Sequence, residues 1–175
     1  ALAEGSAAVA FEQGKIQWTD PVVKYIPGFK TSEPFVTQSL TIQDLLTLRS
    51  GLLNGDTLHA MNRQDLIPKI KDLKISDKYR IDQSSFNLNY TLAAIIAEKI
   101  EGRTWEEIVR NRIFSRLEMN ETYTDLSSAM AACKNVTTPH TVKNGKVIPV
   151  ERVASGIYNP AEGMYSNIID LAKWA

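Results

Sequence analysis

The sequence predicts a mostly helical chain with a single β-hairpin near its C-terminal end. Apolar residues recur at the spacing of one helix face between residues 88 and 101, and again around residues 3–11 and 168–174. Asn144-Gly145 separates two short segments and supplies the two positive φ values that a tight type I′ turn requires. These patterns place helices along most of the chain and a hairpin at about residues 142–150.

Length and composition limit the class of protein. The chain has 175 residues, of which 43% are hydrophobic, enough to form the core of one ordinary domain. It carries 20 basic and 20 acidic residues, so no net field favours phosphates or anionic lipid, and we expect no nucleic-acid partner. The longest purely apolar run, residues 92–97, is far shorter than the roughly 20 residues of a membrane helix, so we expect no membrane span.

Start and stop signals define the individual helices. The first, over residues 3–11, is expected to end before Gly14. Capping-box spacing is found twice, at Thr41-x-x-Asp44 and Thr104-x-x-Glu107, and each should begin a short helix. Asn62 should cap another helix that Pro68 kinks or restarts.

The later elements follow from the same rules. The longest helix should run from about Leu88 to Glu101 and end at Gly102. In the hairpin, Pro149 should limit the pairing of the second strand. Ser166 is the expected N-cap of a last helix that begins at Ile168.

Both ends of the sequence lie inside predicted helices. No residue precedes Ala1 to cap the first helix, and the last pattern reaches Ala175 without a stop signal. We therefore expect residues 1–175 to be a single-domain segment of a larger fold, truncated at both ends. A complete domain with frayed ends is the alternative.

Histidine, cysteine and the sequon asparagines are the residues that could form a metal site, a disulfide or a glycosylation site. His59 and His140 have no second ligand at helical or turn spacing, so no metal site and no cofactor are expected. The single cysteine, Cys133, cannot form an internal disulfide. Sequons at Asn89, Asn120 and Asn135 slightly exceed chance, which favours an extracytoplasmic, glycosylated protein only slightly.

A polar stretch, Ser84-Ser85-Phe86-Asn87, stands directly before the longest predicted helix. Its local explanation is helix capping, because Ser and Asn side chains accept hydrogen bonds from first-turn N–H groups. The alternative is that these polar side chains carry chemistry.

Five stretches favour the second explanation. Residues 14–27, 40–52, 85–102, 112–122 and 159–166, in this order and spacing, resemble the serine β-lactamase and penicillin-binding-protein superfamily, in particular its class C-like branch of esterases, D-peptidases and acyltransferases. No single stretch is specific, but their order is. The resemblance implies a helix-rich segment of an α+β serine β-lactamase/DD-peptidase-like fold, with the main antiparallel sheet largely absent from this chain.

The resemblance also implies a covalent serine mechanism. In this superfamily a Ser-x-x-Lys pair attacks a carbonyl, a Tyr-x-Asn or Ser-x-Asn motif relays protons and binds the substrate amide, and a Lys-Thr-Gly or His-x-Gly motif lines the opposite wall. No serine here is followed three residues later by Lys, and the third motif is absent, so we expect both outside this chain. Ser85 takes the place of the motif tyrosine and Asn87 that of its asparagine.

The predicted site follows from this correspondence. Ser85 is expected to relay a proton and Asn87 to orient the substrate amide. The stretch that resembles a Pro-Ala-Gly-Gly loop, with glutamate in place of a glycine, should border the substrate; its residues are Ala161, Glu162, Gly163, Met164, Tyr165 and Ser166.

The expected function is that of a hydrolase or acyltransferase acting on a small-molecule amide or ester through an acyl-enzyme. Without a visible nucleophile, the 175 residues alone should not turn over substrate. A catalytically inactive family member or scaffold is the alternative, and a free-standing helical binding domain is a third interpretation that would need capped ends.

Overall fold

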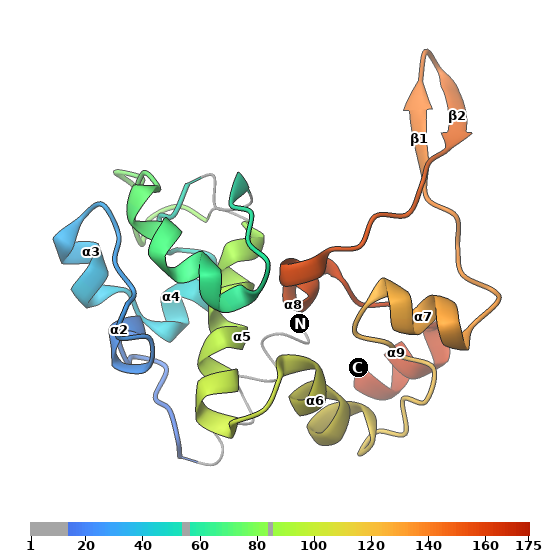
Figure 1. The fold of residues 1–175 in the computed structure, drawn as a ribbon, viewed down its shortest axis with the longest axis horizontal. Coiled ribbons are helices and arrows are strands. Elements are labelled where there is room, and N and C mark those ends of the chain that lie inside the picture. Colours follow the sequence, from blue (N-terminus) through green and yellow to red (C-terminus); the bar gives the residue numbers. More distant parts are fainter. Residues whose placement is uncertain (1–13, 54–56, 84–85) are drawn as a thin grey trace.

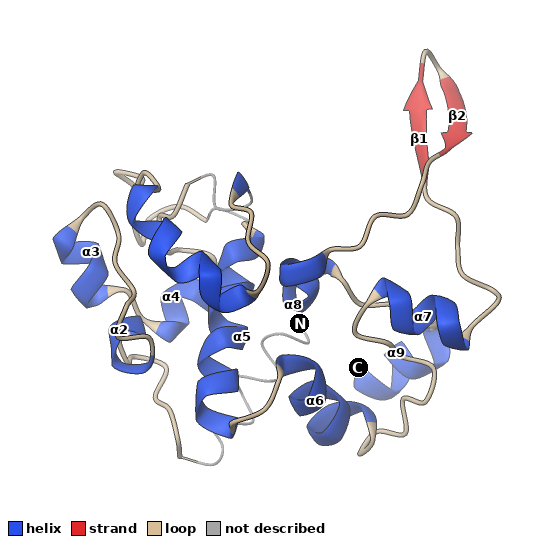
Figure 2. Cartoon of the chain, in the orientation of Figure 1, coloured by secondary structure: helices blue, strands red, loops and turns tan. Residues whose placement is uncertain are grey.

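A computed structural model describes residues 14–53, 57–83 and 86–175. In order, its elements are α2 (Val22–Tyr25), α3 (Pro34–Ser39), α4 (Ile42–Leu46), η2 (Arg63–Asp72), α5 (Asn87–Glu101), α6 (Trp105–Val109), η3 (Arg110–Phe114), α7 (Leu126–Ala132), β1 (His140–Lys143), β2 (Lys146–Pro149), η4 (Gly156–Tyr158), α8 (Asn159–Glu162) and α9 (Ile168–Trp174). The described chain is therefore helix-rich with one two-stranded sheet, as predicted (Figures 1 and 2). The helix predicted over residues 3–11 lies outside the described residues.

Helix α5 is the central element. Helices α2, α3 and α4 lie on one side of it in Figure 1, and α6, α7 and α9 lie on the other. Leu88, Leu92 and Ile96 of α5 enter the larger apolar cluster, together with residues of α2, α3, α4 and η2. Ala94 joins a second cluster around Trp105 and Phe114. Because α5 contributes to both clusters, it fixes the two halves against each other.

The predicted caps account for the helix ends. Gly102 adopts φ of 64°, the left-handed conformation that ends α5 without steric cost. Both capping boxes are formed: Thr41 and Asp44 exchange hydrogen bonds at the start of α4, and Thr104 and Glu107 do so at the start of α6. These three predictions are confirmed.

Element η2 differs from the expected α-helix with a kink. Asn62 caps it, as predicted, by accepting from the N–H of Asp65. The whole segment Arg63–Asp72, however, is a 3₁₀ helix, with Pro68 inside it. Proline has no N–H and clashes with the preceding turn of an α-helix. The segment accommodates Pro68 by forming the tighter 3₁₀ helix instead.

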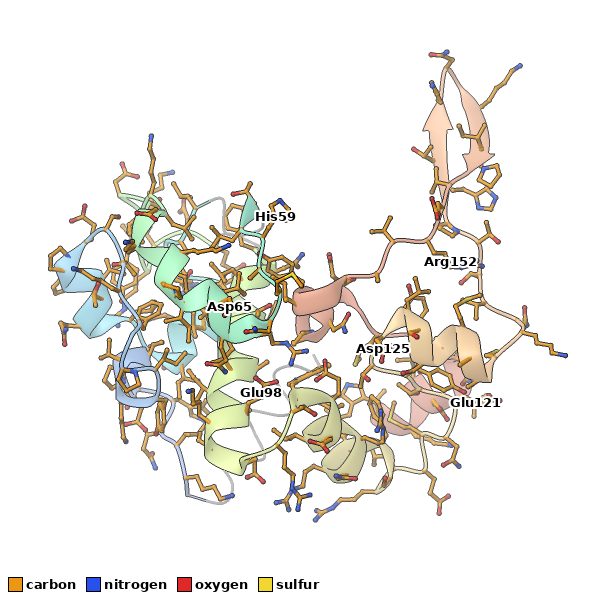
Figure 3. All side chains as sticks on the ribbon, in the orientation of Figure 1. His59, Asp65, Glu98, Glu121, Asp125 and Arg152 are labelled. Atoms are coloured by element: carbon orange, nitrogen blue, oxygen red, sulfur yellow. The ribbon has the colours of Figure 1, made fainter. Side chains whose placement is uncertain are left out.

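The hairpin projects from the body of the molecule (Figure 1). Val142 pairs with Val147, and the turn residues Asn144 and Gly145 adopt φ of 52° and 74°, as a type I′ turn requires. The last strand pair is Pro149 opposite His140, and one further backbone bond follows, from the N–H of Val150 to the carbonyl of Pro139 at 2.9 Å. At the base, labelled in Figure 3, Arg152 donates to the carbonyl of Val136 at 2.6 Å and so ties the two connecting segments together.

The predicted N-cap of α9, Ser166, is wrong. Asn167, not Ser166, caps this helix, by accepting from the N–H of Asp170 at 2.8 Å. The hydroxyl of Ser166 instead lies 2.8 Å from the hydroxyl of Thr122, so it is engaged outside the helix. Ile168 and Ile169 are exposed, whereas Asp170 is only 3% exposed. The buried anchor of this helix is thus a carboxylate.

Three further findings bear on the sequence-based expectations. Within residues 14–53, 57–83 and 86–175, no helix has the length and hydropathy needed to traverse a bilayer. In the same described part of the chain, His, Cys, Asp and Glu form no group of three suited to a metal ion. Of the three sequon asparagines, Asn89 is fully buried in α5 and leaves no room for a glycan, while Asn120 and Asn135 are exposed.

Candidate functional site

Asn87, the candidate substrate-binding amide, is the first residue of α5 and is half-buried. The cap position before it is Phe86, which makes no side-chain capping hydrogen bond. One side-chain bond of Asn87 is tertiary: its Nδ2 donates to Oε2 of Glu162 at 2.8 Å, across 75 positions of sequence. This bond is not a helix cap. Ser85, the other candidate of the motif, lies outside the described residues.

Glu162 is the last residue of α8, which packs against α5. Its carboxylate is exposed and accepts from Asn87. A carboxylate can only accept hydrogen bonds, so it fixes which end of the Asn87 amide faces it. Two stretches that the sequence alone proposed as site segments are thus in direct contact.

Gly163 makes a close backbone approach directly after Glu162. A Cβ atom here would lie 2.3 Å from Oδ1 and 2.6 Å from Cα of Asn159. Contacts under about 3 Å do not occur for real Cβ atoms, and Cα cannot move without the backbone. The turn that carries Glu162 past Asn159 therefore requires glycine.

The end of the loop is held from the opposite side. Tyr165 and Tyr123 each donate a backbone N–H to the other's carbonyl, at 2.9 and 2.8 Å. Met164 packs against the cluster around Trp105. Ala161 is half-buried in α8. Of the six predicted loop residues, only Glu162 contacts Asn87 through a hydrogen bond, and the last three anchor the loop.

Asp170 lies behind this anchor. Its Oδ2 accepts from the N–H of Glu121 at 2.8 Å and from the hydroxyl of Thr122 at 3.0 Å. Burial alone would raise the pKa of this carboxyl, but these hydrogen bonds and Lys173 outweigh it, so the pKa lies below its usual value and the group is ionised. The carboxylate thereby joins the start of α9 to the segment after η3.

A charged network beside the loop was not predicted from the sequence. Arg63 pairs with Glu98 and Glu106 through its two Nη atoms, and its Nε donates to the carbonyl of Ile157 at 3.2 Å. It therefore ties η2 to α5, α6 and the segment that leads into α8; Figure 3 labels Glu98 on α5. The partners are 35 and 43 positions from Arg63, so no local pattern could indicate them.

This network borders a cavity of about 440 Å³. The lining residues come from η2, α5, α6 and the approach to α8; they are Met61, Asn62, Arg63, Gln64, Glu98, Thr104, Glu106, Gly156, Ile157 and Asn159. Because Arg63 is already paired with two carboxylates, its charge is neutralised within the protein.

Comparison with known proteins extends these observations. A hydrolase of unguisins from Aspergillus campestris is 25% identical over 173 residues, which cover 92% of this chain and 32% of that protein. A teichoic acid D-alanine hydrolase from Staphylococcus aureus is 29% identical over 112 residues, covering 63% of this chain and 27% of that protein. The chain thus spans about a third or less of these relatives.

A solved structure gives the same fold. The class C beta-lactamase from Rhodobacter sphaeroides superposes with a TM-score of 0.78 at 20% identity, covering 99% of this chain and 47% of that one. The sequence model that describes the beta-lactamase family matches residues 6–175 of this chain. The matched region includes Asn87, the loop from Ala161 to Ser166 and every described element. This chain therefore belongs to the beta-lactamase family.

Proposed function

We propose that this chain forms the helical part of a serine hydrolase that cleaves a small-molecule amide or ester through an acyl-enzyme. A serine Oγ, from a Ser-x-x-Lys pair outside these 175 residues, bonds to the carbonyl carbon. The C–N or C–O bond to the leaving group breaks, and the serine proton passes to that group. Water then attacks the acyl-enzyme, releasing the acid and returning a proton to the serine.

Two residues of the chain have roles in this proposal. Asn87 orients the acyl donor through its side-chain amide, and Ser85 relays a proton. A serine hydroxyl is much less acidic than a phenol, so Ser85 acts as a relay for the lysine rather than as a base alone. The loop from Ala161 to Ser166 borders the substrate.

One observation carries the proposal: the beta-lactamase family match over residues 6–175 includes both the candidate motif and the candidate loop. The hydrogen bond between Asn87 and Glu162 adds that the two are in contact. It joins the candidate motif to the candidate loop, although neither segment has a local reason to contact the other. Hydrolysis is preferred over acyl transfer because the two relatives described above are named hydrolases.

A non-catalytic scaffold is the second candidate. The same hydrogen bond favours it, since the Asn87 amide nitrogen is already occupied by a protein carboxylate. In a scaffold, Asn87 would serve only to hold α8 against α5.

Labelling with a serine-reactive fluorophosphonate distinguishes the two. The full-length protein that carries this chain is incubated with the probe and its intact mass is measured. The serine hydrolase gains one adduct, and heat-denatured protein gains none. An intact protein that gains no adduct and hydrolyses no amide or ester would leave the scaffold as the function.

A further inference from the structure

We propose that Glu162 makes this site selective for acyl donors that bring an N–H or ammonium group, and against those that bring a carboxylate. The inference rests on the proposed function and adds its substrate class. Glu162 would act in two ways, by fixing the orientation of Asn87 and by placing a negative charge at the substrate.

The orientation follows from hydrogen-bond chemistry. Nδ2 of Asn87 donates to Glu162, and rotating the amide by half a turn would set Oδ1 of Asn87 against the carboxylate. The carboxylate therefore holds Oδ1 on the other side of the amide, as an acceptor. An acceptor at this position can bind an N–H or ammonium group next to the scissile carbonyl. A substrate carboxylate, which can only accept hydrogen bonds, finds no donor there.

The charge of Glu162 differs from that of the acidic residues near the end of α5 and in α6. Glu98 and Glu106 pair with Arg63, and Glu101 pairs with Lys15 and Arg112. Within the described part of the chain, no ion pair joins Glu162 to Lys or Arg. Its exposed carboxylate keeps its charge available to a bound molecule.

The loop geometry keeps this charge in place. A close approach of Gly163 to Asn159 and the pairing of Tyr165 with Tyr123 fix the segment directly after α8. Two unit charges about 4 Å apart at a water-exposed site change an affinity by about fivefold between attraction and no interaction. The affinity of a substrate with an ammonium group should rise by this factor, and the affinity of a substrate with a carboxylate should fall by it.

The test uses the full-length protein and three p-nitrophenyl esters of similar size. Their acyl groups are alanyl, propionyl and hemisuccinyl, which are cationic, neutral and anionic. The kcat/KM of each is measured after subtracting spontaneous hydrolysis. We expect the order alanyl, propionyl, hemisuccinyl, with the first and last differing by about twenty-five-fold, or fivefold for each change of charge.

Two variants separate the two effects. Glu162→Gln keeps an acceptor for Asn87 but removes the charge, so the alanyl-to-hemisuccinyl ratio should fall several-fold, to the part that the orientation of Asn87 alone supports. Glu162→Ala removes the acceptor as well, so kcat for the propionyl ester should also fall. Glu151→Gln, an exposed glutamate near the hairpin, is the matched control and should change neither quantity.

The possible results distinguish a wrong role for Glu162 from a wrong proposed function. If Glu162→Gln retains the wild-type ratio, or if the wild type shows no preference, the role of Glu162 is wrong while the hydrolase stands. If no ester is hydrolysed and no fluorophosphonate adduct forms, the proposed function is wrong and the selectivity falls with it.

Discussion

Thr122 donates its hydroxyl to the carboxylate of Asp170 at 3.0 Å, and this contact holds the last helix to the segment after η3. Asp170 is 3% exposed and also accepts from the backbone N–H of Glu121. The pair lies directly behind the anchored end of the candidate loop, where Ser166 also contacts Thr122. Stability and loop position should therefore depend on one carboxylate.

Replacing Asp170 tests this dependence. Asp170→Asn leaves Lys173 without its ion pair and presents an amide group where Oδ2 accepted two hydrogen bonds. We expect the free energy of unfolding to fall by about 2 kcal/mol. Urea denaturation measures this as a lower midpoint at unchanged slope. Asp72→Asn, at an exposed site in η2, is the control; equal midpoints for the two variants would contradict the assigned role.

Removing Arg63 should be more damaging. Arg63→Ala leaves the carboxylates of Glu98 and Glu106, whose side chains are 16% and 22% exposed, without a cation. Uncompensated charges of this kind cost about 3 kcal/mol. Arg63→Lys should recover little, because an ammonium cannot reach two carboxylates and a carbonyl in one plane. Thermal unfolding measures both, with Arg116→Ala as an exposed control. Full stability of Arg63→Lys would show that the planar arrangement of donors in the guanidinium group is unimportant.

Gly163→Ala should disturb the loop selectively. Its Cβ would overlap the backbone of Asn159, so α8 must move and Glu162 with it. Gly28→Ala is a matched control, because its Cβ would meet only the Ile67 side chain at an ordinary 3.6 Å. We expect Gly163→Ala to lower kcat/KM of the full-length protein and Gly28→Ala to leave it unchanged. An active Gly163→Ala variant would mean that the loop position does not matter for catalysis.

Stability should decline in acid. Hydrogen bonds from Lys24 and Tyr25 lower the pKa of Asp20 from 3.8 to about 2. The pKa of Asp44 is also lowered, because hydrogen bonds from Arg80 and Thr41 outweigh its burial. Folded-state pKa values below the unfolded ones give stability that is complete above about pH 4 and is lost as the pH falls toward 2.

Urea midpoints between pH 7 and pH 2.5 measure this loss. Asp44→Asn should lower the midpoint at pH 7 and make its dependence on pH shallower, because one of the titrating groups is gone. An unchanged pH dependence in this variant would mean that Asp44 does not contribute. Asp77→Asn, exposed in the segment after η2, serves as the control.

The sequence predicted what local chemistry determines. Capping boxes, Gly102 and the Asn144-Gly145 turn act within four residues, and each is found where expected. The N-cap of α9 was misplaced by one residue because Ser166 has a distant partner, Thr122. The Arg63 network and the burial of Asp170 depend on tertiary contacts, which single-residue patterns do not encode. The contact between Asn87 and Glu162 belongs to the same class: the resemblance identified both segments, but only the structure joins them.

The most direct test of the central claim is the effect of Asn87→Ala on ester hydrolysis by the full-length protein. If Asn87 binds the acyl donor, kcat/KM falls by about a hundredfold, while fluorophosphonate labelling of the serine persists. Asn111→Ala, an exposed asparagine in η3, should keep the wild-type value. Full kcat/KM in Asn87→Ala, with a thermal midpoint that falls, would contradict the account and leave Asn87 as a purely structural link between α5 and α8.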